Sequence, residues 1–112
     1  MRENQHTEFK ESWHDEYTRY ISAFCNTEGG VLYIGIDDKG EVVGIEQPKK
    51  LIEKLPNFIA QKTGIMPLIH LREKAGKEYL EIEVQPSAMP ISVHGRYYTG
   101  VEALLPSYRG IS

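Results

Sequence analysis

Apolar residues recur along the chain at two different spacings, and each spacing predicts one kind of secondary structure. Steps of three and four residues, typical of one face of a helix, connect a first set of side chains: Trp13, Tyr17, Tyr20, Ile21 and Phe24. Ser12 can cap the N-terminus of this helix, and Asp15 follows it as an acidic variant of the capping box. We therefore predict a first helix from Ser12 to about Phe24.

A second helical pattern follows Pro48, a residue that suits the first turn of a helix. Its apolar positions keep the same period: Leu51, Ile52, Leu55, Phe58 and Ile59. Pro56 falls inside the pattern and predicts a kink or two abutting segments. Gly64, directly after Thr63, is expected to end the helix.

Strand patterns surround these helices. Residues 7–10 alternate, so Phe9 is expected to point inward while Glu8 and Lys10 point to the other face. Residues 31–36 form an almost unbroken apolar run, which predicts a strand buried on both faces. Residues 41–45 are expected to return beside this run as the second arm of a hairpin.

Two further hairpins are predicted in the second half of the chain. Residues 68–74 and 78–85 read as strands joined at Ala75-Gly76-Lys77, and residues 91–94 and 97–99 as strands joined around Gly95. Alternation along residues 79–84 assigns Leu80, Ile82 and Val84 to the core, and Tyr79, Glu81 and Glu83 to the outside. The predicted fold is α+β, a mixed β-sheet with helices packed on it.

Two turns next to residues 31–36 carry candidate functional residues. Asn26 can bond backbone groups as the first helix ends, and Gly29 and Gly30 supply the positive φ angles of a tight reversal. After the strand, Asp37 and Asp38 either present a site or form only a hairpin turn, since Asp and Gly are ordinary turn residues.

Composition narrows the class of protein. A chain of 112 residues forms one small domain, and its single cysteine, Cys25, excludes an internal disulfide and is expected to be a small core residue. The formal charge of −3 argues against coating nucleic acid by bulk positive charge, although a local basic groove is compatible with it. The N-terminus lacks signal-peptide character and no apolar run reaches membrane-span length, so we expect a cytoplasmic protein without a membrane partner.

Histidines and aromatic residues give weaker signals. The four histidines show no metal-ligand spacing, and we interpret them as ordinary surface or partly buried imidazoles: His6, His14, His70 and His94. Trp13, Tyr17 and Tyr20 could stack on nucleic-acid bases, but their helical spacing favours a core role.

Several blocks occur together in an order typical of one family. They are Glu-Phe-Lys at 8–10, Ile-Ser-Ala-Phe-Cys-Asn-Thr-Glu-Gly-Gly at 21–30, Ile-Gly-Ile-Asp-Asp-Lys-Gly at 34–40 and Gly-Ile-Met-Pro at 64–67. With the hairpin at residues 90–98, these blocks resemble the Schlafen AlbA_2 domain, whose bacterial members were first described as a divergent AAA domain. The resemblance covers most of the chain.

The resemblance implies a nucleic-acid partner, DNA or RNA. Bacterial members are commonly the N-terminal part of longer transcriptional regulators or helicase-related proteins, with a winged-helix or ATP-binding region behind. We therefore expect a DNA-binding domain that contacts mainly the phosphate backbone. The residues expected to contact nucleic acid are Lys10, Lys39, Arg96, Tyr98 and Arg109. Related domains often work in pairs, so a homodimer is a further expectation.

Animal relatives imply a different activity, RNA cleavage by three acids. Carried over by position, these acids fall on Glu3, Glu8 and Asp38. Three converging carboxylates would favour Mg²⁺ or Mn²⁺, which activates water for phosphodiester cleavage. A metal-dependent endoribonuclease is thus one alternative to a binding domain that needs no cofactor, and a structural or dimerising module of a larger ATP-binding regulator is another.

The segment after the last hairpin departs from the family pattern. Family members continue with a basic, hydroxyl-rich sequence similar to Arg-Ser-Gly-Ser-Thr-Thr, whereas residues 100–108 read Gly-Val-Glu-Ala-Leu-Leu-Pro-Ser-Tyr. Codons exist for this stretch that give the family sequence when read one nucleotide out of frame. We therefore hypothesise a frameshift near Thr99, which divides the chain into a domain at 1–99 and an altered segment at 100–112.

Overall fold

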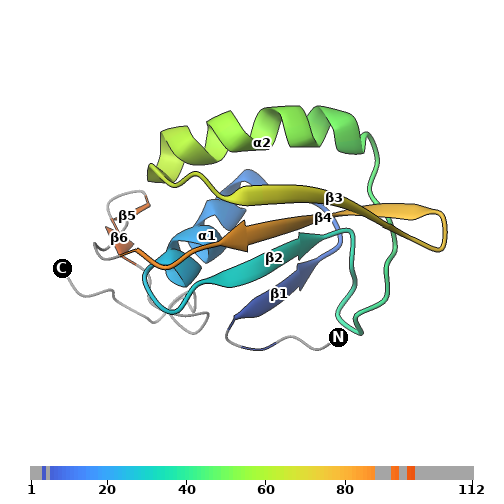
Figure 1. The fold of residues 1–112 in the computed structure, drawn as a ribbon, viewed down its shortest axis with the longest axis horizontal. Helices are drawn as coiled ribbons and strands as arrows, with labels where there is room; N and C mark the ends of the chain where they lie inside the picture. Colours follow the sequence, from blue (N-terminus) through green and yellow to red (C-terminus); the bar gives the residue numbers. More distant parts are fainter. Residues whose placement is uncertain (1–3, 5, 88–91, 94–95, 98–112) are drawn as a thin grey trace.

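The computed structural model describes residues 4, 6–87, 92–93 and 96–97, the last four as backbone only. Its centre is a four-stranded sheet in the order β1-β2-β4-β3, with two helices packed against it (Figure 1). The strands are β1 (Thr7–Lys10), β2 (Gly30–Ile34), β3 (Leu68–Lys74) and β4 (Lys77–Val84). The helical segments are the 3₁₀ turn η1 (Asp15–Tyr17), α1 (Thr18–Cys25) and α2 (Pro48–Thr63).

The sheet is mixed, as predicted for an α+β domain. Strand β1 runs parallel to β2, whereas β2 with β4 and β4 with β3 are antiparallel. Strands β5 (Ser92–Val93) and β6 (Arg96–Tyr97) form a separate antiparallel hairpin at the place predicted for the last one. In the described part of the chain, no helix is both long and apolar enough to cross a membrane.

The core lies between the helices and one face of the sheet. Leu32 and Ile34 of β2 and Leu80 and Ile82 of β4 are fully buried there, together with Phe24 of α1 and further residues of both helices. Alternation along β4 is confirmed, because Tyr79, Glu81 and Glu83 are only partly buried. We call the face that bears these three residues the open face; it is the face turned toward the viewer in Figure 1, where β4 passes in front of α1.

The apolar run at residues 31–36 predicted a strand buried on both faces, but strand β2 is buried on one face only. Leu32 and Ile34 are fully buried, whereas Val31 and Tyr33 on the open face are partly exposed. The physical reason is that the described helices cover one face of the sheet only, so the second set of apolar side chains lacks a covering layer.

The edge strand β1 distributes its side chains over the two faces in the opposite way from β2 and β4. Its buried apolar residue lies on the open face, and its charged residues lie on the helix side. Phe9 is buried as predicted, with 1% of its surface exposed, but register pairs it with Tyr33 and so places it on the open face. The Phe9 and Tyr33 rings lie 5.7 Å apart. Glu8 and Lys10 therefore lie on the helix side of the sheet, next to α1.

The first helix begins later than predicted. Ser12 is not its N-cap, since α1 starts at Thr18 after the 3₁₀ turn, and the Ser12 hydroxyl lies 3.4 Å from Nε2 of His14. Asp15 does not complete a capping box, because its carboxylate accepts hydrogen bonds from Trp13 Nε1 and Lys54 Nζ at 2.7 and 3.1 Å. These side-chain partners outweigh the local capping pattern.

The turn between α1 and β2 forms where it was predicted, but its two glycines have different roles. Asn26 is the C-cap residue of α1, and Gly29 adopts a φ of 85°. Gly30 has no positive φ and is instead required by close packing. A Cβ at this position would lie 2.5 Å from Phe24 Cδ1 and 2.8 Å from the His6 carbonyl oxygen.

The predicted hairpin arm at residues 41–45 is not a strand. Only a single bridge joins Ile36 to Val42 in this region. The N–H groups of Val43 and Gly44 both donate to the carbonyl oxygen of Gly35, and Gly44 has a φ of 85°, so the extended backbone is interrupted. The region is therefore a loop that leads into α2.

The sequence predicted a kink or two abutting segments at Pro56. Helix α2 is continuous through Pro56, so the second of these alternatives is wrong. The helix ends at Gly64, as predicted, with a φ of 75°. The β3–β4 connection is shorter than predicted. Ala75 and Gly76 have φ angles of 54° and 78°, the pattern of a two-residue type I′ turn.

Candidate functional site

Lys10 is the best candidate for a functional cation in the described residues. It lies at the end of β1 with 26% of its side chain exposed, and its ammonium nitrogen is 5.0 and 5.3 Å from the ring centres of Tyr20 and Tyr17. Its carboxylate partner is Glu8, 3.6 Å away on the same strand face. Glu8 itself is 12% exposed. Lys10 and Glu8 thus share one strand face, as predicted, and this face is the helix side of the sheet.

The surroundings of Lys10 keep its side chain charged. Partial burial lowers its pKa, but a hydrogen bond to the Tyr20 hydroxyl and the attraction of Tyr20 and Glu8 raise it by more. The net pKa is therefore above the usual value for a lysine. A cation held over two rings also gains from the negative potential of the ring faces. Lys10 is thus a positioned positive charge at neutral pH.

The aromatic contacts continue from Lys10 across α1 to α2. The centres of the Tyr17 and Tyr20 rings are 5.7 Å apart, those of Trp13 and Tyr17 are 5.9 Å apart, and those of Trp13 and Phe58 are 6.5 Å apart. All four rings are partly exposed, although Trp13, Tyr17 and Tyr20 also pack against the core as predicted. These rings therefore pack against the core and also expose part of their surface to solvent.

Two further lysines lie against the far end of this chain of rings. The ammonium nitrogens of Lys54 and Lys62 are 5.1 and 5.8 Å from the centre of the Phe58 ring. We call the four rings and three lysines the aromatic–lysine strip: Tyr20, Tyr17, Trp13 and Phe58 with Lys10, Lys54 and Lys62. Such an alternation of rings and cations can contact bases through the rings and phosphates through the lysines.

A shallow cleft of about 490 Å³ adjoins the strip between the β1–α1 connection and the start of α2. Its lining includes Trp13, Lys50 and Lys54, but also Glu11 and Glu46. The acids offset the lysines, which agrees with the acidic balance of the whole chain. The basic character of this surface is therefore local.

Asp15 of η1 connects this turn to α2 at the surface, next to the strip. Hydrogen bonds from the Trp13 indole and Lys54 hold the pKa of its carboxyl below the usual range. The indole donates at 2.7 Å and the ammonium group at 3.1 Å. Because Trp13 precedes η1 and Lys54 lies on α2, this carboxylate fixes the separation of two parts of the strip.

The acids expected to form a nuclease site are only partly within the described residues. Glu3 lies outside them, Glu8 is paired with Lys10, and Asp38 is exposed in the turn after β2. Asp37 stabilises this turn, because its carboxylate accepts hydrogen bonds from the N–H groups of Lys39 and Glu41 at 2.9 and 3.0 Å. The β1–β2 register pairs Glu8 with Leu32, and Asp38 lies six residues after Leu32 in the chain. The three-acid site stays a prediction.

The other expected contact residues are not among the residues that form the strip. Lys39 is exposed at the turn after β2. Arg96 belongs to β6, of which only the backbone is described, while Tyr98 and Arg109 lie outside the described residues. The segment at 100–112 and the frameshift hypothesis also depend on residues beyond this part of the chain. The same holds for the strand predicted at 97–99, which would offer an open edge to a second copy in a homodimer.

Cys25 is a core residue, as expected. It is 4% exposed at the end of α1. Burial raises the pKa of its thiol, and a hydrogen bond with Ser87 lowers it by less. The thiolate that a nucleophile requires is therefore disfavoured.

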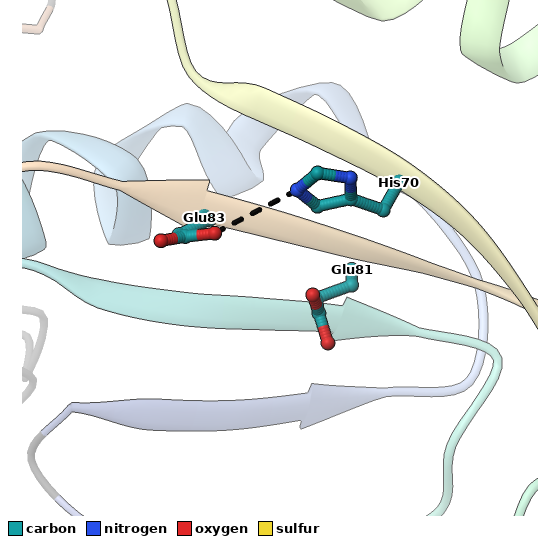
Figure 2. Close-up of side chains that lie close together, drawn as sticks. All are labelled: His70, Glu81 and Glu83. Carbon is teal, nitrogen blue, oxygen red and sulfur yellow. Dashed lines mark ion pairs between the residues drawn. The ribbon is translucent and has the colours of Figure 1, made fainter.

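Sequence reasoning missed a group of possible metal ligands on the open face. His70 of β3 lies beside Glu81 and Glu83 of β4, and one ligand atom from each residue lies within 4.8 Å of the other two (Figure 2). One feature of the sequence could have revealed this group, namely the short connection between β3 and β4. A two-residue turn at Ala75-Gly76 fixes a register in which His70 is directly opposite Glu81.

Comparison with known proteins reveals relatives with this fold. The sequence model of the family described as Schlafen, AlbA_2 matches residues 3–102. The structure is similar to the N-terminal domain of a Nitrosomonas europaea protein described as related to the ATP-dependent DNA helicase RecG. The TM-score is 0.66 and the identity 25%, over 100% of this chain and 82% of that one.

A second solved structure, the DIP2311 protein of Corynebacterium diphtheriae, has a TM-score of 0.70 and 24% identity. The match covers 83% of this chain but 20% of that protein, so the chain spans about a fifth of this relative. This likeness confirms the fold. Because the family match covers most of its length, the chain belongs to the Schlafen AlbA_2 family.

Proposed function

We propose that this domain binds nucleic acid through the aromatic–lysine strip and contacts mainly the phosphate backbone. DNA is the expected ligand, in the context of a larger transcriptional regulator. The observation that carries the proposal is the charged Lys10 ammonium group held over the partly exposed rings of Tyr17 and Tyr20. The family match and the helicase-related relative support the same class of ligand.

The arrangement suits a ligand that offers both negative charge and flat apolar rings. A phosphate can replace Glu8 as the partner of Lys10, while bases stack on the exposed parts of the tyrosine and indole rings. The formal charge of −3 leaves no general attraction for polyanions. Binding must therefore be local, modest in affinity and strongly weakened by salt.

The test is fluorescence anisotropy with labelled single- and double-stranded DNA and RNA, over a series of salt concentrations. Lys10→Gln should weaken binding several-fold and reduce the slope of log K against log salt by about one. The matched control is Lys74→Gln, because Lys74 is exposed at the distant end of β3 and loses the same charge. Lys74→Gln should bind as the wild type does.

Equal affinities for the wild type and Lys10→Gln would contradict the proposal. Absence of binding to all four ligands at low salt, together with concentration-dependent dimerisation, would support a structural module instead. The same samples incubated with Mg²⁺ or Mn²⁺ test the ribonuclease alternative. Cleavage that Glu8→Gln abolishes and Glu41→Gln retains would identify Glu8 as a catalytic residue and direct attention to Glu3 and Asp38.

The frameshift hypothesis needs a separate measurement. The intact mass of protein expressed from the native gene decides between the printed residues 100–108 and the hydroxyl-rich family sequence. If the printed sequence is correct, replacing these residues with the family sequence should strengthen nucleic-acid binding, because arginine and hydroxyl groups contact phosphates.

A further inference from the structure

The open face of the sheet carries a cluster that the proposed nucleic-acid site does not use. His70 extends from β3, and Glu81 and Glu83 extend from β4 toward the same region in front of the sheet (Figure 2). Nε2 of His70 is 3.6 Å from Oε2 of Glu83. The three side chains are partly exposed, so solvent ions can reach them. Lys10 and the aromatic–lysine strip lie on the other side of the sheet.

Backbone register holds these residues together. The type I′ turn pairs His70 directly with Glu81, and Glu83 is two residues further along the same face of β4. Side chains that are directly or diagonally opposite on neighbouring strands lie within contact distance. The cluster is therefore fixed by a seven-residue antiparallel ladder of β3 with β4, and not by a loop.

Neighbouring residues orient both carboxylates. The Gln85 side-chain amide donates to Oε1 of Glu83 at 3.3 Å, which leaves Oε2 facing the imidazole. Arg72 donates to Oε1 of Glu81 at 3.3 Å. Contacts of this kind around ligating groups fix their orientation in metal sites.

We propose that His70, Glu81 and Glu83 bind a divalent transition-metal ion, with Zn²⁺ as the best match to one imidazole and two carboxylates. Imidazole favours Zn²⁺ over Mg²⁺ and Ca²⁺, which prefer oxygen ligands alone. Three protein ligands leave one tetrahedral position for water or an anionic ligand. This inference concerns a different face from the proposed nucleic-acid site and does not depend on it.

The geometry requires only small side-chain movements. A tetrahedral zinc ion with bond lengths of about 2.1 Å needs ligand atoms roughly 3.4 Å apart. The present separations are at most 4.8 Å, and the His70–Glu83 pair is already at 3.6 Å. Because 38% of the His70 side chain and 39% of the Glu83 side chain are exposed, both have room for the small movement toward a shared ion.

The test is calorimetric titration of chelator-treated, untagged protein with Zn²⁺, followed by the NMR signals of the histidine side chains. One equivalent should bind, and the His70 imidazole should shift more than those of His6 and His14. His70→Gln and Glu83→Gln should each weaken binding by at least about tenfold, because each removes one ligand of three. Glu73→Gln is the matched control, because Glu73 lies on β3 with His70 but outside the cluster. This variant should bind Zn²⁺ as the wild type does.

Absence of Zn²⁺ binding by the folded wild-type protein would overturn the proposal. Binding that His70→Gln and Glu83→Gln both retain would overturn it as well, since another group would then be the ligand. Amide spectra of both variants verify that they are folded. Neither variant is expected to change nucleic-acid affinity, so failure of the metal proposal and failure of the nucleic-acid proposal are distinguishable.

Discussion

The two faces of the four-stranded sheet are formed by the same strands, yet they differ in what covers them and in what they can bind. Along β4, Leu80, Ile82 and Val84 are buried beneath the helices, while Tyr79, Glu81 and Glu83 face outward and are partly exposed. The groups that we propose for nucleic-acid binding lie at the rim of the helix side, where α1 meets β1. The open face presents polar groups directly on its strands.

On β4, this difference separates the residues that stabilise the fold from the residues that we propose as metal ligands. Residues beneath the helices contribute mainly by burial of apolar surface. Exposed ion pairs, such as those on the open face, contribute little to stability. Strand β1 is the exception, because it places Phe9 on the open face and Lys10 on the helix side.

Replacement of Phe9 tests this exception and has the largest expected effect. Phe9→Ala should lower the free energy of unfolding by about 3–5 kcal/mol, because a ring with 1% exposure leaves a cavity. Urea denaturation measures the change. Phe58→Ala is the comparison, since this ring is partly exposed and should cost less. A loss below about 1 kcal/mol for Phe9→Ala would show that the open face is unpacked even at β1.

Adjacent positions on β4 give the most direct comparison of the two faces. Ile82→Ala should cost about 2–5 kcal/mol, because the side chain is fully buried in the core. Glu81→Ala removes an exposed ion pair with Arg72 and should cost less than about 1 kcal/mol. Both variants are measured by urea denaturation with unchanged m-values. Similar losses for the two would contradict the division into a covered and an open face.

The rim of the helix side should respond to acid, with a smaller effect. The pKa of Asp15 is lowered in the folded state by its bonds to Trp13 and Lys54. Its stabilising contribution is therefore complete above about pH 5, since an unfolded aspartate has a pKa near 3.9. The contribution is lost as the pH falls through the lower pKa of the folded state.

Asp15→Asn isolates this contribution. The thermal midpoint of the wild type should fall more steeply with acidification than that of Asp15→Asn, and the two curves should converge at low pH. Glu53→Gln, an exposed acid on α2, is the control and should follow the wild type. Parallel curves for the wild type and Asp15→Asn would show that the carboxylate does not stabilise the contact between η1 and α2.

The sequence by itself located both helices, the four strands of the sheet and most of their buried residues. Helical spacing located the residues of α1 and α2 that pack on the sheet, and alternation assigned each side chain of residues 79–84 in β4 to the correct face. Proline at 48 and glycine at 64 correctly marked the two ends of α2. These features are local, because they depend on residues within one or two turns of the chain.

Local patterns failed where a distant partner decided the conformation. Asp15 was expected to cap a helix but is held by Trp13 and Lys54, and residues 41–45 were expected to form a strand but fold over Gly35. Gly30 was assigned to a positive φ, whereas contact with Phe24 is the actual reason for glycine. In each case, a contact formed in the folded chain outweighs a propensity.

Only the tertiary structure decided which side of the sheet each group occupies and which groups meet. Alternation places Phe9 and Lys10 on opposite faces, but the parallel pairing of β1 with β2 determines that Lys10 faces the tyrosines of α1. Likewise, His70 is unremarkable in sequence until the β3–β4 register sets it against Glu81 and Glu83. Sites of this kind arise from strand pairing, which composition and spacing do not specify.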